Sequence, residues 1–377
     1  MDRRTFLFGT GTLALSQLLA GCNPQVSDTL QVQFLRGSIP PIIVDRFHQQ
    51  IQQNPRARFT PVAQLQEIFN QLQAWHEQAN RTPSRSLPFL TQQSQSPNPA
   101  ALMSLGDYWL AAAIEQQLIQ PLDITQLQTW NALPRRWQEL VRRNQQGEPD
   151  AQGQIWAAPY RWGSTVILYN RDKINSLGWT PTDWSDLWRP ELRSRISLID
   201  QSREVIGLTL KRLGQSYNTQ NLNEIPNLEQ QLQALHQQVR LYSSNRYIEP
   251  LIIGDTWVAV GWSTDVLPVM QRYREIAVVV PQSGTALWAD LWVNPVNAVL
   301  PTLASQWINF CWQPPIAQQI SLRSNGTSPV PTELLLGSRQ RSRIILTDAQ
   351  LQRSEFLLPL PATVQQQYDA LWQTIRT

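Results

Sequence analysis

Tryptophan and carboxylate side chains alternate along residues 287–292, which read LWADLW. If this segment is a strand, Trp288, Asp290 and Trp292 share one face, because strand side chains alternate with a period of two. An aromatic face attracts a cation by roughly 0.5 to 2 kcal/mol, and a carboxylate adds a charge-assisted hydrogen bond. The spacing therefore indicates a site for a cation. The alternative is a strand whose indoles are core and whose aspartate caps a loop.

A second carboxylate cluster, Asp200 to Glu204, lies between a predicted strand at 196–200 and a predicted helix at 204–213. In α/β folds this is where strands present ligand-binding groups. The simpler interpretation is that Ser202 caps the helix while Glu204 interacts with the positive end of the helix dipole.

Further tryptophans stand next to predicted strands. Trp162 belongs to the segment 159–170, PYRWGSTVILYN, in which a turn-like WGST is predicted to precede an apolar strand. Trp262 follows a predicted strand at 257–260, where core packing and a binding rim are equally compatible with it. Tyr108 follows the predicted strand at 101–105 in the same way.

The elements that would position these residues alternate between strand and helix periodicity. Thr60-Pro61 resembles a helix start, and 80–100 is predicted to be a surface loop. This alternation favours an α/β fold with mainly parallel sheets. Further strands are predicted at 30–35, 154–158, 165–169 and 276–280, and further helices at 62–75, 108–117, 135–145, 172–177, 228–241 and 303–311.

Composition narrows the function classes. The chain has 377 residues, enough for two lobes, and its 42% hydrophobic residues exclude a disordered protein. A net charge of +3 does not provide the basic stripe that nucleic-acid binding needs. Two cysteines and three scattered histidines predict neither a disulfide framework nor a metal site, and no cofactor is expected. Cys311 is expected to be a buried thiol. The 16 tryptophans outnumber the 8 tyrosines and 9 phenylalanines, an excess that requires an explanation.

The N-terminus has the features of an export signal. Arg3 and Arg4 precede a short apolar stretch that ends in Leu-Ala-Gly-Cys22. The arginine pair resembles a twin-arginine export motif, and the last four residues resemble a bacterial lipobox. This resemblance implies cleavage before Cys22, lipidation of its thiol and a protein tethered to the outer face of a membrane. The alternatives are an ordinary cleaved signal and a transmembrane helix, for which the stretch is short.

The order of these motifs resembles the extracellular solute-binding proteins, in particular their spermidine/putrescine-binding branch. The resemblance implies a two-lobed periplasmic-binding-protein type 2 fold with a ligand cleft between the lobes. It covers nearly all of the chain after the signal. The implied divisions are a signal at 1–21, a tether at 22–29, lobe 1 at 30–160 plus 288–330, and lobe 2 at 161–287 plus 331–377.

The resemblance also implies a set of site residues. Glu204 and Asp290 would receive ammonium groups, and Trp262, Trp288 and Tyr108, with Trp162 as a further candidate, would line the methylene chain. Three residues depart from the polyamine-binding pattern: Gln201 stands where a second acid is usual, Arg36 lies near the expected cleft, and Thr327 replaces an aromatic residue. These departures leave open a ligand that is shorter, less charged or not a polyamine.

The expected function is a monomeric, lipid-anchored component of an ABC importer, which closes on a small cationic solute and delivers it to a membrane permease. The expected class is therefore not an enzyme. One alternative is a secreted glycoside hydrolase that uses a pair among Asp200, Glu204 and Asp290. The other is a tethered scaffold that binds no solute.

Overall fold

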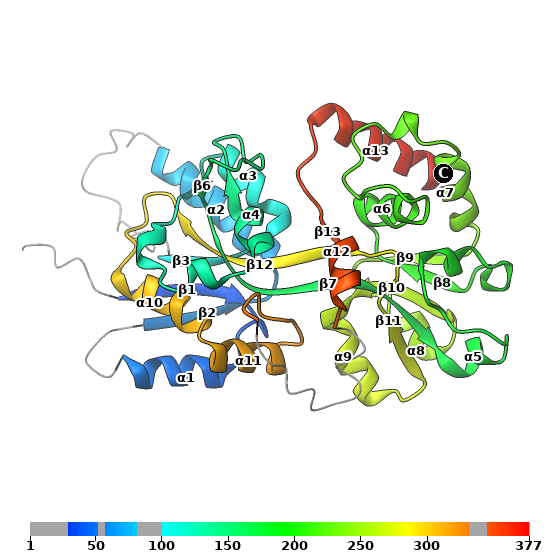
Figure 1. The fold of residues 1–377 in the computed structure, drawn as a ribbon, viewed down its shortest axis with the longest axis horizontal. Helices are drawn as coiled ribbons and strands as arrows, with labels where there is room; N and C mark the ends of the chain where they lie inside the picture. Colours follow the sequence, from blue (N-terminus) through cyan, green and yellow to red (C-terminus); the bar gives the residue numbers. More distant parts are fainter. Residues whose placement is uncertain (1–28, 52–56, 81–99, 332–344, 377) are drawn as a thin grey trace, which may run out of the picture.

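The computed structural model describes residues 29–51, 57–80, 100–331 and 345–376. The chain forms two α/β halves, which are joined by two long strands that run through both (Figure 1). This arrangement confirms the predicted fold class. None of the helices in these ranges is both long and apolar enough to cross a membrane.

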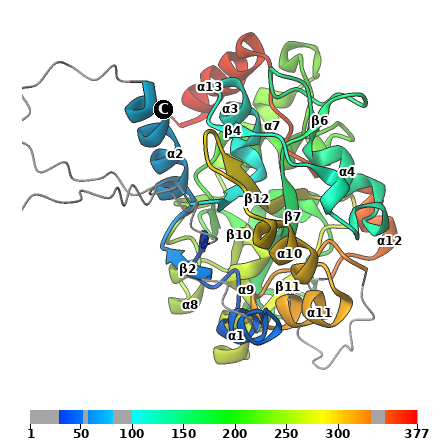
Figure 2. The ribbon, with the colours of Figure 1, turned by 90° about the vertical axis from the view of Figure 1, so that its left-hand side faces the viewer.

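The first half contains parallel strands β1 (Leu30–Leu35), β2 (Ala57–Val62) and β3 (Leu102–Gly106), with β1 in the middle. Alternate residues of β1 are fully buried, as the period-two pattern predicted. Its principal helices are α1 (Pro41–Gln50), α2 (Leu65–Asn80), α10 (Thr302–Cys311) and α11 (Pro314–Arg323), which surround the sheet in two views (Figures 1 and 2).

The second half is built on strands β8 (Ile196–Leu198), β9 (Val239–Tyr242), β10 (Val258–Trp262) and β11 (Ile276–Val279). β8 lies between β9 and β10 and is parallel to both. On this half pack the helices α6 (Ser202–Arg212), α7 (Leu228–His236), α9 (Ser263–Arg272) and α13 (Ala362–Arg376).

Two antiparallel strands, β7 (Ala158–Asn170) and β12 (Ala286–Pro295), connect the halves. The first part of β7 pairs with β12, and its later part pairs with β10 and β11. β12 in turn pairs with β3 of the first half. One continuous sheet therefore extends across the molecule, and residues near the middle of β7 lie where the two halves meet (Figure 1).

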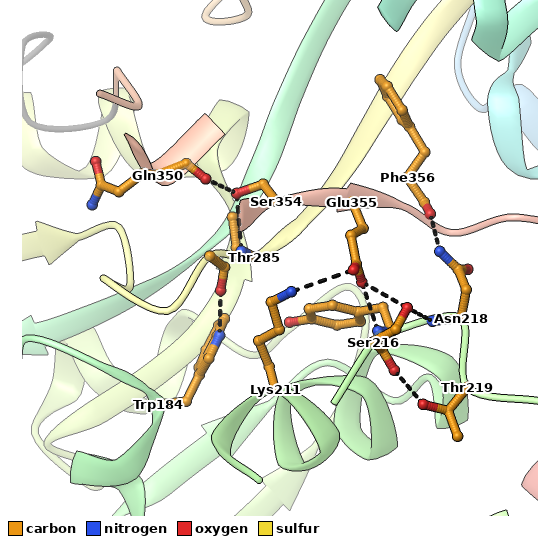
Figure 3. Close-up of polar contacts among 12 residues, drawn as sticks. Trp184, Lys211, Ser216, Asn218, Thr219, Thr285, Gln350, Ser354, Glu355 and Phe356 are labelled. Atoms are coloured by element: carbon orange, nitrogen blue, oxygen red, sulfur yellow. Dashed lines mark hydrogen bonds and ion pairs between the residues drawn. The ribbon is translucent and has the colours of Figure 1, made fainter. Parts of the chain in front are cut away.

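The C-terminal segment returns to this junction. Strand β13 (Glu355–Phe356) pairs with the start of β12, and the Glu355 carboxylate accepts hydrogen bonds from Tyr217 N at 2.7 Å and Ser216 Oγ at 3.1 Å (Figure 3). Lys211 Nζ lies 3.4 Å from the same carboxylate. These contacts hold the chain before α13 against the loop that follows α6.

Most of the tryptophan excess is packing. Trp292 stacks on Tyr160 with ring centroids 4.2 Å apart, and it meets Trp307 in an edge contact with centroids 5.9 Å apart. Cys311 is buried beside them, as predicted. Six indoles are at most 3% exposed: Trp130, Trp137, Trp184, Trp292, Trp307 and Trp312.

Three sequence-based assignments are wrong. Thr60 and Pro61 do not begin a helix; they lie in β2, an edge strand, where the missing N–H of proline is tolerated. The segment WGST at 162–165 is not a turn, because it continues through the middle of β7. The helix predicted at 228–241 ends at His236, and the residues from Val239 form β9.

The remaining predicted strands and helices are present with shifted ends, and the predicted loop at 80–100 lies mostly outside the described ranges. The other elements of more than two residues are the helices α3 (Leu110–Glu115), α4 (Arg135–Val141), α5 (Arg171–Asn175), α8 (Glu249–Ile253) and α12 (Asp348–Arg353) and six short 3-10 turns.

Candidate functional site

One face of β7 organises most of the candidate residues. Residues 161, 163 and 165 point to the same side of the strand, and the neighbouring strands place Asp290, Trp288 and Trp262 opposite them in that order. The row spans about 13 Å at ~3.3 Å per residue. Residues distant in sequence therefore form one line across the junction between the halves.

Glu204 lies at one end of this row. It occupies the first turn of α6, and its carboxylate oxygens lie 2.9 and 3.1 Å from the Thr165 hydroxyl, which donates to them. The residue is 4% exposed. In the described part of the chain, no lysine or arginine forms an ion pair with it. A buried carboxylate without a cationic partner is costly unless a ligand supplies the charge.

Burial raises the pKa of Glu204 to about 7, although hydrogen bonds from the Thr165 and Trp262 side chains and the charge of Arg203 act in the opposite direction. Arg203 itself donates to the carbonyl of Leu358 and to Asn218, so its guanidinium is directed elsewhere. The Glu204 carboxyl therefore holds its proton to a higher pH than an ordinary glutamate does.

Trp262 ends β10 beside Glu204, and its backbone is fixed by a tyrosine. The Trp262 N–H donates to the Tyr247 hydroxyl at 3.1 Å, and that hydroxyl donates to Asp265 Oδ2 at 2.7 Å. Gly261 permits this contact, because a Cβ atom there would lie 1.8 Å from the Tyr247 ring. The glycine and the tyrosine together set the position of the indole.

Asp290 lies at the other end of the row and already has a cationic partner. Arg161, directly opposite on β7, places both Nε and Nη2 2.6 Å from Asp290 Oδ2. The arginine Nη1 donates to the carbonyl of Ser324 at 3.0 Å, and both side chains are almost fully buried. The pKa of Asp290 is raised by burial, which the Arg161 charge and hydrogen bond partly offset.

Trp288 lies between the two ends. The Arg161 guanidinium carbon is 5.5 Å from its ring centroid, within range of a cation–π interaction. Gly163 allows the indole to approach β7, because a Cβ at 163 would lie 2.2 Å from the ring. Within the described structure the buried indole nitrogen of Trp288 has no hydrogen-bond partner.

Asp107 is a candidate that the sequence analysis did not select. It follows β3, and its Oδ1 accepts the backbone N–H of Ala289 at 2.9 Å. Burial, with a smaller contribution from the charge of Asp290, raises the pKa of Asp107 to about 7, although the Ala289 N–H and the Arg143 charge act in the opposite direction. The position of Asp107 directly after a strand is a signal that the sequence carries, and the same signal led to the prediction of the neighbouring Tyr108.

The other predicted residues lie around this row. Tyr108 is 58% exposed and lies close enough to Arg203 to influence the pKa of that arginine. Gln201 is exposed at the N-cap of α6 without a capping bond, and it, rather than Ser202, occupies that position. Trp162 points to the opposite face of β7 and packs on Trp137, with centroids 5.1 Å apart.

Thr327 exchanges backbone hydrogen bonds of 2.8 Å with Trp162, and Arg36 is exposed after β1. The predicted export and lipidation residues, Arg3, Arg4 and Cys22, lie outside the described residues. No cluster of three or more His, Cys, Asp or Glu side chains suited to a metal occurs in the part of the chain that the structure describes.

Known proteins resemble this chain in sequence and in structure. A family profile described as "Bacterial extracellular solute-binding protein" matches residues 96–343. The "Spermidine/putrescine-binding periplasmic protein" of Salmonella typhimurium is 28% identical over 214 residues, 57% of this chain and 59% of that protein. The "Putrescine-binding periplasmic protein PotF" of Escherichia coli is 30% identical over 230 residues, 56% of this chain and 60% of that protein. The chain thus spans about three fifths of the length of these relatives.

Solved structures share the fold over a longer stretch. The "Spermidine/Putrescine ABC Transporter Substrate-Binding Protein PotD" from Streptococcus pneumoniae has a TM-score of 0.76 at 19% identity and covers 92% of this chain and 98% of its own. The "Tp0655 (TpPotD) Lipoprotein" of Treponema pallidum has a TM-score of 0.70 at 19% identity, covering 92% and 99%. These relatives are binding proteins rather than enzymes, as expected, and this chain belongs to the bacterial extracellular solute-binding proteins.

Proposed function

We propose that this protein is the substrate-binding component of an ABC importer, and that it captures a small organic cation, either a polyamine or a shorter amine. The observation that carries the proposal is the buried Glu204 carboxylate, which has Thr165 and Trp262 beside it but no ion-pair partner in the described ranges. The site thus lacks one positive charge that a ligand can supply.

The row along β7 fits an amine with an apolar body. An ammonium group at Glu204 would gain a charge-assisted hydrogen bond, and the indoles of Trp262 and Trp288 offer apolar faces for methylene groups. Both indoles are partly exposed, unlike the six that are packed in the cores. The relatives named for spermidine and putrescine support an amine as the ligand.

Capture would proceed by closure of the two lobes, with β7 and β12 as the connection that bends. We place lobe 1 at 30–160 plus 288–330 and lobe 2 at 161–287 plus 331–377. A ligand that contacts both lobes favours the closed form in proportion to its differential affinity, and a membrane permease would recognise that form. Each proposed lobe contributes a carboxylate bonded to a residue of the row or next to it: Asp107 accepts the Ala289 N–H, and Glu204 accepts from the Thr165 hydroxyl.

We further propose that the protein acts as a monomer on the outer side of the cytoplasmic membrane and is held there by lipid on Cys22 after export directed by Arg3 and Arg4. A lipidated cysteine carries enough acyl chain for stable attachment only when more than one chain is added. Replacement of Cys22 by serine should move the protein from the membrane fraction to the soluble fraction. Continued membrane association of Cys22→Ser would contradict lipid anchoring.

A thermal-shift screen of the purified chain tests the function. The panel contains putrescine, spermidine, spermine, simple monoamines, amino acids, sugars and ferric iron, with Glu204→Gln as the matched control. At a ligand concentration of about 100 times the dissociation constant, binding stabilises the fold by ~2.7 kcal/mol, and a shift of this size in the melting curve is readily detected. Amines should stabilise the wild type and not the variant.

Two outcomes would favour the alternative functions, a glycoside hydrolase or a scaffold that binds no solute. Hydrolysis of an oligosaccharide would indicate a paired-carboxylate enzyme, although Asp200, one of the three candidate acids, forms an ion pair with Arg376 at 2.5 Å. Stabilisation by no member of the panel would indicate a scaffold.

A further inference from the structure

Arg161 places a positive charge inside the row of candidate ligand contacts. It is 6% exposed, and its backbone lies directly opposite Asp290 in the β7–β12 register. The guanidinium makes two contacts of 2.6 Å to one carboxylate oxygen and one of 3.0 Å to the Ser324 carbonyl. Three short contacts on a buried side chain define a fixed position.

The same guanidinium also uses the aromatic face beside Asp290. Its central carbon is 5.5 Å from the Trp288 ring centroid. An acid and an aromatic face are the two groups that would receive an ammonium ion at this end of the row, and one arginine engages both. Gly326 leaves room for the arginine stem, since a Cβ at 326 would lie 2.6 Å from Arg161 Cγ.

We infer that Arg161 is an internal cation that occupies the Asp290–Trp288 end of the site, and that the protein therefore selects an amine with a single ammonium group, received by Glu204. The inference rests on the proposed function and specifies its ligand class. The ligand body would run from Glu204 past Gly163 and Trp288 and end facing the guanidinium. A second ammonium there would meet a like charge.

The charges around this end of the row are consistent with the selection. Asp290 is neutralised by Arg161, and Asp107 is held by the Ala289 N–H with the Arg143 charge nearby. Asp265 is hydrogen-bonded by Tyr247. Glu204 is 4% exposed and has no cationic ion-pair partner in the described structure, whereas Asp107, which also lacks an ion pair there, is only partly buried and already accepts the Ala289 N–H.

Isothermal titration of the full purified chain with n-pentylamine and with putrescine tests this inference. The readout is the ratio of the two dissociation constants, because a purely structural role of Arg161 would change both constants together. Wild type should bind pentylamine at least as tightly as putrescine. In Arg161→Met, which removes the charge and keeps an unbranched stem, putrescine should gain at least about tenfold relative to pentylamine.

Two further variants keep the test decisive. Arg161→Lys retains a positive charge and should retain the wild-type ratio. Because Arg161→Met leaves a buried aspartate unpaired, it could unfold; the double variant Arg161→Met with Asp290→Asn removes both charges and should bind pentylamine without any gain for putrescine. Putrescine should also raise the melting temperature of Arg161→Met more than pentylamine does.

The outcomes are distinguishable. One outcome is that wild type binds putrescine more than about tenfold tighter than pentylamine and that Arg161→Met has the same ratio. This outcome would overturn the role of Arg161 and leave the amine-binding function standing. Absence of binding of either amine to wild type and to all variants would overturn the proposed function and this inference with it.

Discussion

The ionisation of Glu204 is set by its surroundings, and this makes ligand binding depend on pH. Its pKa is raised to about 7 chiefly by burial, whereas an alkylammonium remains charged well above that pH. A neutral carboxyl is a poor partner for a cation. Amine affinity should therefore rise between pH 6 and pH 8, approaching tenfold per unit below the pKa, and proton release should accompany binding below pH 8.

Titration calorimetry in two buffers of different ionisation enthalpy measures both effects. In Glu204→Gln any remaining binding should lose this pH dependence. A wild-type affinity that is constant from pH 6 to pH 8 would contradict the assignment of Glu204 as the group that receives the ammonium.

The same carboxylate should reduce the stability of the unliganded fold at high pH. Its pKa is higher in the folded chain than the ordinary value of 4.5, so the folded state binds the proton more tightly. This contribution is present below pH 4.5 and is lost as pH rises through about 7. The rise of the Glu204 pKa from 4.5 to about 7 corresponds to about 3 kcal/mol of unfolding free energy. Glu204→Gln should be more stable than wild type at pH 8, and the difference should shrink near pH 5.

Urea unfolding at the two pH values checks this prediction, because all other ionisable groups are common to the two proteins. A variant that is less stable than wild type at pH 8 would show that the ionised carboxylate has favourable contacts that outweigh its burial.

At the residue scale, the sequence predicted what local periodicity can predict. A period of two placed Trp288 and Asp290 on one face, and the strand-to-helix transition placed Glu204 where α/β folds present ligand-binding groups, whereas its role as an ammonium acceptor was implied by the resemblance. The Arg161–Asp290 pair joins residues 129 positions apart, and only the register of β7 against β12 brings them together. The partner of Asp290 was therefore beyond a single-sequence argument.

At the element scale, the site depends on β7, and Gly163 is the position at which this strand admits the Trp288 ring. Gly163→Ala should displace the Trp288 ring, because the new Cβ would lie 2.2 Å from it. We expect amine binding to weaken by about 3- to 30-fold, the value of one aromatic contact, with a stability loss of roughly 1 to 3 kcal/mol from overpacking. Fluorescence titration and urea unfolding measure the two effects.

Gly178→Ala is the matched control. A Cβ at 178 meets no atom within 4 Å, but the backbone there has a φ of +81°, so the substitution costs only conformational strain, about 1 to 2 kcal/mol. Stability should fall without any change in amine affinity. Equal affinities for wild type and Gly163→Ala would remove Trp288 from the site.

Two of the strands that the sequence analysis missed share a cause. β2 and β9 are edge strands, and each pairs in parallel with a single neighbour. Their strand conformation comes from pairing with β1 and β8, which local residue preferences do not encode. The turn predicted at WGST is wrong for a different reason. Gly163 gives the Trp288 indole room against β7 and does not form a turn.

At the scale of the whole molecule, length and alternation of elements were sufficient to predict two α/β halves, and the family confirms that architecture. Of the 16 tryptophans, eight are buried, six pack against the cores while partly exposed, and Trp262 and Trp288 flank the row on β7. Composition could not reveal the charge balance of the site. Arg161 neutralises Asp290, whereas Glu204 has no ion-pair partner in the described structure and is left for a ligand.

Calorimetric titration of wild type and Glu204→Gln with pentylamine and putrescine tests the central claim most directly. The account predicts saturable binding of amine at one site per chain in wild type, and at least about tenfold weaker binding in the variant, with the fold retained. Equal affinity in the two proteins, or no binding of any amine to wild type, would contradict it.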